Sequence, residues 1–192
     1  MTFTNLLPFL LILVYSEVVA LVHRKCISPS PSSNFTLDGY YGLWFEVGKI
    51  QTFGGALLQR HCVCTTVQVA PKTNRTNGDC TAVNSCRKLK PQGQYLNATG
   101  YLENMNPPGK WKQWFFVFAP EADYTVIYLD KDFAVEYDCS DKLGMTNYCI
   151  HILARVPNPD PTKVQSLVEF AEGLGLNKSK LRYKETKQRG CW

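Results

Sequence analysis

The chain has 192 residues, of which 45% are hydrophobic and 19% are charged, and its formal net charge is +5 at pH 7. This length suits one domain with a sizeable core, and no stretch beyond residue 20 reaches the roughly 18 apolar residues of a membrane span. The positive charges are scattered rather than gathered into a stripe, which argues against a nucleic-acid-binding protein.

The first 20 residues have the features of a signal peptide. An apolar run from Leu6 to Val14 precedes Ala20, a small residue that suits signal-peptidase cleavage. Eight cysteines and four Asn-x-Ser/Thr sequons point to the same oxidising pathway. The sequons lie at Asn34, Asn74, Asn97 and Asn177. We therefore expect a secreted, extracellular glycoprotein with disulfide bonds and no membrane anchor.

Residues 21–39 contain Pro29, Pro31 and four serines, which predicts an extended N-terminal arm. Short segments with strand-like alternation, separated by turn residues, then follow one another. The expected strands are 44–51, 61–70, 80–89, 94–103, 112–119, 123–130, 133–139 and 147–156. Eight strands with short connections predict an all-β domain over residues 40–192, built as an eight-stranded up-and-down antiparallel barrel.

One helix is expected after the strands. Asp160 suits an N-cap and Pro161 suits the first helical position. Apolar residues then recur with helical spacing at Val164, Leu167, Val168 and Ala171. A single apolar stripe implies that one face of this helix packs on the outside of the barrel. A short strand near 180–184 and a tail complete the chain.

The first strand opens with Gly42-x-Trp44-Phe45-Glu46, which resembles the opening motif of the lipocalins in their apolipoprotein D-like branch. The segments 133–139 and 152–157 are similar to two later family motifs, and the resemblance runs from about residue 35 to residue 191. At 128–130, Tyr-Leu-Asp stands where the family has Thr-Asp-Tyr. The resemblance implies a lipocalin barrel whose closed end is filled by Trp44 after Gly42, with Arg155 covering the indole.

The family pattern also implies two disulfides. One joins Cys26 to Cys139 and ties the arm to the barrel wall. The other joins Cys62 to Cys191 and pins the C-terminal tail. Both close long loops, where a cross-link restricts the unfolded chain most.

A third disulfide is predicted from the alternation of side chains along the strands. Cys64 would share a face with Cys62 and come opposite Cys86 in a hairpin, which predicts a Cys64–Cys86 bond. Whether Cys80 and Cys149 are bonded or free stays open. Zinc at Cys62-x-Cys64 is an alternative, but no second Cys/His pair of the usual spacing follows, so we expect no metal and no cofactor.

Side-chain alternation on two of the expected strands indicates which residues line the pocket. A glycosylated Asn97 points outward, so Leu96, Ala98 and Leu102 point inward. If Arg155 reaches over the tryptophan, His151 shares its face and lines the cavity. There it would be the one polar group in an apolar wall and would orient a ligand. The alternative is a core histidine satisfied by the hydroxyl of Tyr148 or Tyr128.

The same alternation, carried to the adjacent strand, places Phe133, Val135 and Tyr137 in the wall and leaves Glu136 outside. The resemblance to lipocalins also implies that the apolar loop that begins at Phe53 folds over the open end as a lid.

The resemblance implies a carrier of a small hydrophobic molecule such as a retinoid, fatty acid, sterol-like lipid, carotenoid or bilin. Because some lipocalin-like proteins act through a cavity thiol, a thiol-dependent enzyme acting on a lipid is one alternative. Cys64, Cys80 or Cys149 would be the nucleophile if it were free. We expect no enzyme, since no Ser/His/Asp or paired-carboxylate arrangement accompanies these cysteines. A secreted scavenger that binds a partner through its loops is a second alternative, and a barrel filled by its own side chains is a third. No protein partner can be named.

Overall fold

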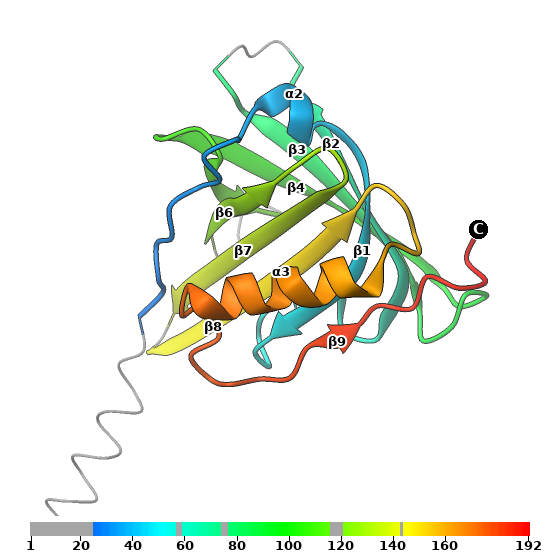
Figure 1. The fold of residues 1–192 in the computed structure, drawn as a ribbon. Coiled ribbons are helices and arrows are strands. Elements are labelled where there is room, and N and C mark those ends of the chain that lie inside the picture. Colours follow the sequence, from blue (N-terminus) through cyan, green and yellow to red (C-terminus); the bar gives the residue numbers. More distant parts are fainter. Residues whose placement is uncertain (1–24, 57–58, 74–76, 116–120, 143) are drawn as a thin grey trace, which may run out of the picture.

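The computed structural model describes residues 25–56, 59–73, 77–115, 121–142 and 144–192. In this part of the chain, nine strands form one antiparallel sheet in the order β2-β3-β4-β5-β6-β7-β8-β1-β9, and β1 also pairs with β2 and closes a barrel (Figure 1). Their bounds are β1 Gly42–Gln51, β2 Cys62–Pro71, β3 Cys80–Lys88, β4 Tyr95–Met105, β5 Lys110–Trp114, β6 Ala122–Leu129, β7 Phe133–Lys142, β8 Met145–Ala154 and β9 Lys184–Glu185. The predicted eight-stranded up-and-down barrel is therefore confirmed.

The predicted helix is also present as α3, Pro161–Gly173, and the Asp160 side chain accepts a hydrogen bond from the N–H of Thr162. It lies across the outside of the barrel (Figure 1). Leu167 and Val168 are buried in one cluster with residues of β7 and β8 such as Val135 and Ile152. Because α3 covers them, these two strands are buried on both faces.

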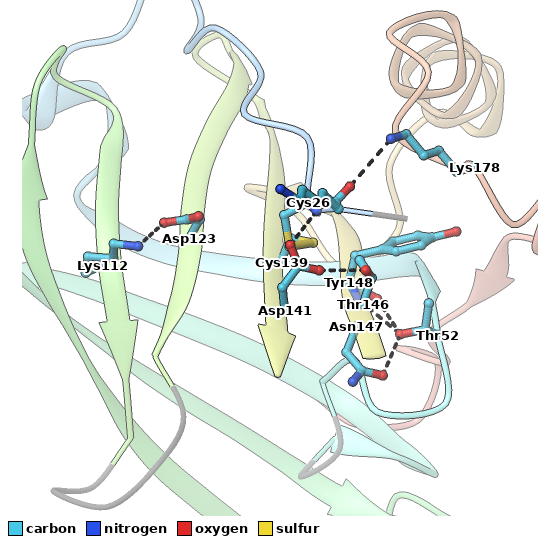
Figure 2. Close-up of a disulfide and its surroundings, with 11 residues drawn as sticks. Cys26, Thr52, Lys112, Asp123, Cys139, Asp141, Thr146, Asn147, Tyr148 and Lys178 are labelled. Atoms are coloured by element: carbon cyan, nitrogen blue, oxygen red, sulfur yellow. Dashed lines mark hydrogen bonds and ion pairs between the residues drawn. A yellow bond between two sulfur atoms is a disulfide. The ribbon is translucent and has the colours of Figure 1, made fainter. Parts of the chain in front are cut away.

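The arm runs along the outside of the barrel and ends in a short helix, α2 (Leu37–Tyr40), which the sequence analysis did not anticipate (Figure 1). The predicted Cys26–Cys139 disulfide is present, and the Cys26 N–H also donates to the carboxylate of Asp141 at 2.7 Å (Figure 2). Further along, the Ser32 N–H donates to a carbonyl of β6 at 2.9 Å. The arm is thus fixed to the barrel. The predicted signal peptide, residues 1–20, lies outside the described residues.

The other two predicted disulfides are wrong. Cys62 bonds to Cys86, and Cys64 bonds to Cys191. The register between β2 and β3 shifts within residues 63–66, and Cys64 has a φ of 55°. This bulge interrupts the alternation on which the prediction relied. It turns Cys64 toward the C-terminal tail, where its N–H donates to a tail carbonyl at 2.8 Å.

The tail completes the barrel wall. Strand β1 pairs with β2 only over residues 42–45, and β9 pairs with β1 beyond that point. The side-chain amide of Gln188 bridges the gap by donating to the carbonyls of Glu46 and Thr65, each at 2.8 Å. The described residues include no helix long and apolar enough to cross a membrane.

Candidate ligand-binding site

A cavity of about 610 Å³ opens inside the barrel, at the end opposite α2. This volume lies within the range of about 300 to 1,000 Å³ typical of small-molecule pockets. The loop after β1 contributes backbone and small side chains at Gly54, Gly55 and Ala56. The strands contribute a mixed wall, which includes Val67, Ala82, Asn84, Leu96, Ala98, Gln113, Phe115, Tyr124, Glu136, Asp138 and His151.

Of the pocket residues predicted on β4 and in the loop at Phe53, only some line the cavity. Leu96 and Ala98 line the cavity. Leu102 also points inward but lies in the closed-end cluster with Trp44. Phe53 is 78% exposed, and the guanidinium of Arg60 lies 4.2 Å from its ring centre. Phe53 therefore points away from the cavity, and small residues of the same loop line it instead.

The predicted orientation of β7 is wrong, because the side chains expected inside the barrel lie outside and the reverse. Phe133, Val135 and Tyr137 pack on the outer side, in the cluster that includes α3. Glu136, predicted outside, is buried and lines the cavity together with Asp138. The apolar residues of β7 face outward because α3 covers that side. Alternation is clear in the sequence, but it does not say which face is inside.

His151 faces the cavity as predicted, but the wall around it is ionic rather than apolar. Its Nδ1 lies 2.6 Å from the Glu46 carboxylate and its Nε2 lies 3.1 Å from the Asp138 carboxylate. The other Glu46 oxygen accepts hydrogen bonds from Lys49 at 2.8 Å and from Thr186 of the tail at 2.7 Å. The proposed partner hydroxyls of Tyr148 and Tyr128 are thus replaced by carboxylates from two other strands.

This cluster holds its charges through mutual neutralisation. Burial by itself would raise the pKa of Glu46, but Lys49 and His151 lower that pKa to about 2. Burial would lower the pKa of His151, yet Cys149, Asp138 and Glu46 raise it well above its usual value. Glu46 therefore loses its proton more readily, and His151 keeps its proton to higher pH, than the same groups do in water. These paired charges make the ionic wall stable inside the barrel.

A second polar group, centred on Glu136, lies deeper in the cavity. The Tyr40 hydroxyl donates to the Glu136 carboxyl at 2.5 Å and lies 2.7 Å from the Tyr124 hydroxyl. Burial raises the pKa of Glu136. This carboxyl group can therefore take up a proton more readily than an exposed one, and its surroundings suit hydrogen bonding to a ligand. The predicted orientation of β7 had placed Glu136 outside the barrel, so this group was not among the predicted pocket residues.

The closed end matches the predicted arrangement. The Arg155 guanidinium lies 3.4 Å from the ring centre of Trp44, which is fully buried. Its nitrogens donate to three main-chain carbonyls, each at 2.8 Å, on Gly39, Tyr41 and Leu43. Gly42 has a φ of 103°, and a Cβ there would lie 3.2 Å from a guanidinium nitrogen. This position therefore requires glycine.

The departure from the family triplet at 128–130 retains a structural role. The Asp130 carboxylate accepts the N–H groups of Asp132 at 2.8 Å and Phe133 at 2.6 Å, and the Tyr128 hydroxyl at 2.6 Å. It thereby caps the hairpin between β6 and β7.

The described sequons differ in accessibility. Asn34 and Asn97 are exposed. The amide nitrogen of Asn177 donates to the Glu172 carboxylate and to a main-chain carbonyl, each at 2.8 Å. A glycan on Asn177 would replace one of the two N–H donors that make these bonds, so this sequon is less suited to modification than Asn34 and Asn97. Asn74 lies outside the described residues.

Comparisons with known proteins agree with this architecture. A family model described as a lipocalin-like domain matches residues 35–186. Apolipoprotein D of Mus musculus is 25% identical over 171 residues, covering 87% of this chain and 84% of the relative. Apolipoprotein D of Bos taurus is 26% identical over 161 residues, covering 82% of this chain and 80% of the relative.

Two solved structures resemble the fold. Insecticyanin from the tobacco hornworm Manduca sexta has a TM-score of 0.62 at 18% identity, over 85% of this chain and 86% of that one. Lobster apocrustacyanin A1 has a TM-score of 0.60 at 14% identity, and the match covers 79% of this chain and 78% of that one. At these identities the likeness concerns the fold.

Proposed function

This chain belongs to the lipocalin family, and we propose that it is a secreted carrier that holds one small hydrophobic molecule inside its barrel. The observation that carries the proposal is the cavity of about 610 Å³. A barrel of eight strands is wide enough either to be filled by side chains or to hold one small ligand, and this volume favours the ligand. The disulfides Cys26–Cys139, Cys62–Cys86 and Cys64–Cys191 support an extracellular location.

The lining narrows the class of ligand. Val67, Leu96 and Phe115 offer apolar contact, whereas the carboxyl groups of Glu136 and Asp138 face the same space. Carboxyl oxygens accept hydrogen bonds, so they favour a ligand whose polar end carries a donor. We therefore favour an apolar molecule with a hydroxyl or N–H group. Among the expected classes, a retinol-like, sterol-like or bilin ligand fits better than a fatty acid whose carboxylate meets this wall.

The thiol-enzyme alternative is less well supported. Burial raises the pKa of both Cys80 and Cys149 to about 11. A thiolate is the reactive form, so thiols with raised pKa values are weak nucleophiles at neutral pH. Titration of native protein with a thiol reagent tests this directly. Rapid reaction at either cysteine would revive the enzyme alternative.

The carrier proposal is tested by blocking the cavity. Ala98 lines it, whereas Tyr101 on the same strand is exposed outside. An Ala98→Trp substitution fills the space and should weaken binding of retinol or an apolar fluorophore by about 100-fold or more, roughly 2.7 kcal/mol. Tyr101→Trp is the matched control and should bind like the unmodified protein. Equal binding by both variants would place the ligand elsewhere, and absence of binding by the unmodified protein would contradict the carrier.

Purification under native conditions complements this test. Solvent extraction followed by mass spectrometry should recover a small apolar molecule with a hydrogen-bond donor. Loss of that molecule in Ala98→Trp, but not in Tyr101→Trp, would assign it to the cavity.

A further inference from the structure

Three groups that commonly bind metal ions meet on the inner face of β7 and β8. Asp138 lies directly opposite Cys149, and His151 follows two residues along on the same face of β8. The donor atoms of the three side chains all lie within 4.8 Å of one another, and His151 Nε2 is 3.1 Å from an Asp138 oxygen. Cys149 is fully buried, and Asp138 and His151 line the cavity.

We propose that Asp138, Cys149 and His151 bind a divalent transition-metal ion of the zinc type, with a remaining coordination position directed to the cavity. Zinc binds thiolate, imidazole and carboxylate at about 2.0 to 2.3 Å, so ligand atoms in a tetrahedral site stand about 3.3 to 3.8 Å apart. The three ligand atoms, all within 4.8 Å of one another, lie close to this spacing. A set that combines sulfur and nitrogen favours zinc over calcium or magnesium, which prefer oxygen ligands.

The surroundings of His151 provide an independent argument. Its Nδ1 lies 2.6 Å from Glu46, which leaves Nε2 toward Asp138 and Cys149. In metal-binding histidines, the N–H of the second ring nitrogen usually donates a hydrogen bond to a carboxylate, which fixes the ring orientation. Glu46 is itself held by Lys49 and Thr186 through its other oxygen. The ring is therefore already oriented as a metal ligand requires.

The charge balance also permits a cation. Lys49, a positive group of the same cluster, is paired with the Glu46 carboxylate at 2.8 Å. A metal ion of charge +2 would face the Asp138 carboxylate and the Cys149 thiolate, and His151 would be neutral. The cluster is then electrically balanced, and any protons held by the ligand atoms leave as the metal binds.

Strand β1 supplies one more oxygen near this position. Gln51 pairs with Cys149 across the sheet. Its buried Oε1 has no hydrogen-bond partner among the described residues, although its amide nitrogen donates to Gly55 at 3.0 Å. The residue that pairs with Cys149 therefore carries a buried amide oxygen.

Cobalt and zinc titrations of the metal-free full chain test the proposal without any apolar ligand, so the outcome is separate from the carrier proposal. One equivalent of Co²⁺ should bind with a sulfur-to-cobalt charge-transfer band, and Zn²⁺ should displace it. Cys149→Ser should abolish the band and weaken binding by about 100-fold or more, since even outer partners of metal ligands contribute roughly 10- to 100-fold.

Cys80→Ser is the matched control, because Cys80 is the other unbonded cysteine of the described chain and lies in the closed-end cluster. It should leave the band and the affinity unchanged. Stoichiometric binding by the unmodified protein is a measurement that needs no variant. Failure of stoichiometric binding, or a band that survives in Cys149→Ser, would overturn the site.

Discussion

The two ends of the barrel bury charge in different ways. At the closed end, one cation, Arg155, lies on the face of Trp44 and donates to main-chain carbonyls that precede and follow Gly42. Every partner of this guanidinium belongs to one short segment of the chain. A compact motif therefore supplies all of these partners, and only Arg155 itself comes from a distant part of the chain.

In the cavity half, charged side chains satisfy one another. Glu46 comes from β1, Asp138 from β7 and His151 from β8, while Thr186 reaches the cluster from the tail. These residues are far apart in sequence, and their contacts depend on which strands become neighbours. The comparison shows that one distant residue, Arg155, completes a compact motif at the closed end, whereas the polar cluster of the cavity half draws single residues from four separate segments.

The largest expected effect is the loss of Glu46. Glu46→Ala leaves Lys49 and His151 buried without their shared carboxylate, and breaking a buried ion pair costs about 3 to 5 kcal/mol. Urea unfolding followed by circular dichroism measures this change. Asp123→Ala, which removes the exposed partner of Lys112 (Figure 2), is the control and should cost less than about 1 kcal/mol. Equal losses would contradict the central role of the cluster.

Substitution of Arg155 at the closed end should lower the stability of the protein without changing its affinity for a ligand. Arg155→Ala removes the contact with Trp44 and three hydrogen bonds, for an expected loss of about 2 to 3 kcal/mol. Tryptophan fluorescence should shift, whereas affinity for an apolar ligand should stay within about threefold, under 1 kcal/mol. Unchanged stability with lost binding would reverse the roles assigned to the two ends.

A smaller effect is expected at Gly42. Gly42→Ala places a side chain at a φ of 103° and next to the guanidinium, which should cost about 1 to 3 kcal/mol. Gly173→Ala, at the end of α3 with open space around its Cβ position, is the control and should be neutral or slightly stabilising. Thermal melting of the two variants separates backbone strain from a general effect of adding a methyl group.

The smallest effect concerns acid stability at the β6–β7 hairpin. Burial opposes ionisation of Asp130, but the hydrogen bonds from Tyr128, Asp132 and Phe133 lower its pKa below 3.8. A lowered pKa contributes stability above the unfolded value, and that contribution is lost as the pH falls through the folded value. Asp130→Asn should therefore be less stable than the unmodified protein at pH 7 and pH 5. The difference should shrink below about pH 3.8, and a difference that persists there would show that ionisation is not its source.

Several features followed from local sequence patterns. Strand alternation and turn residues predicted the eight barrel strands, and Asp160 with Pro161 located the start of α3. The Gly42 motif predicted the contact between Trp44 and Arg155. These features depend on residues close in sequence or on one recognisable motif, so a single chain is enough to reveal them.

Only the tertiary structure decided which face of β7 is inside and which cysteines pair. Helix α3 buries the outer face of β7, so Val135 and Glu136 alternate without indicating the cavity side. The bulge within 63–66 redirects Cys64 to the tail, although its position in the sequence suggests a neighbour on β3. The ionic wall around His151 likewise depends on contacts between distant strands. Packing and register determine such contacts, because a two-residue repeat specifies alternation but neither its partner nor its orientation.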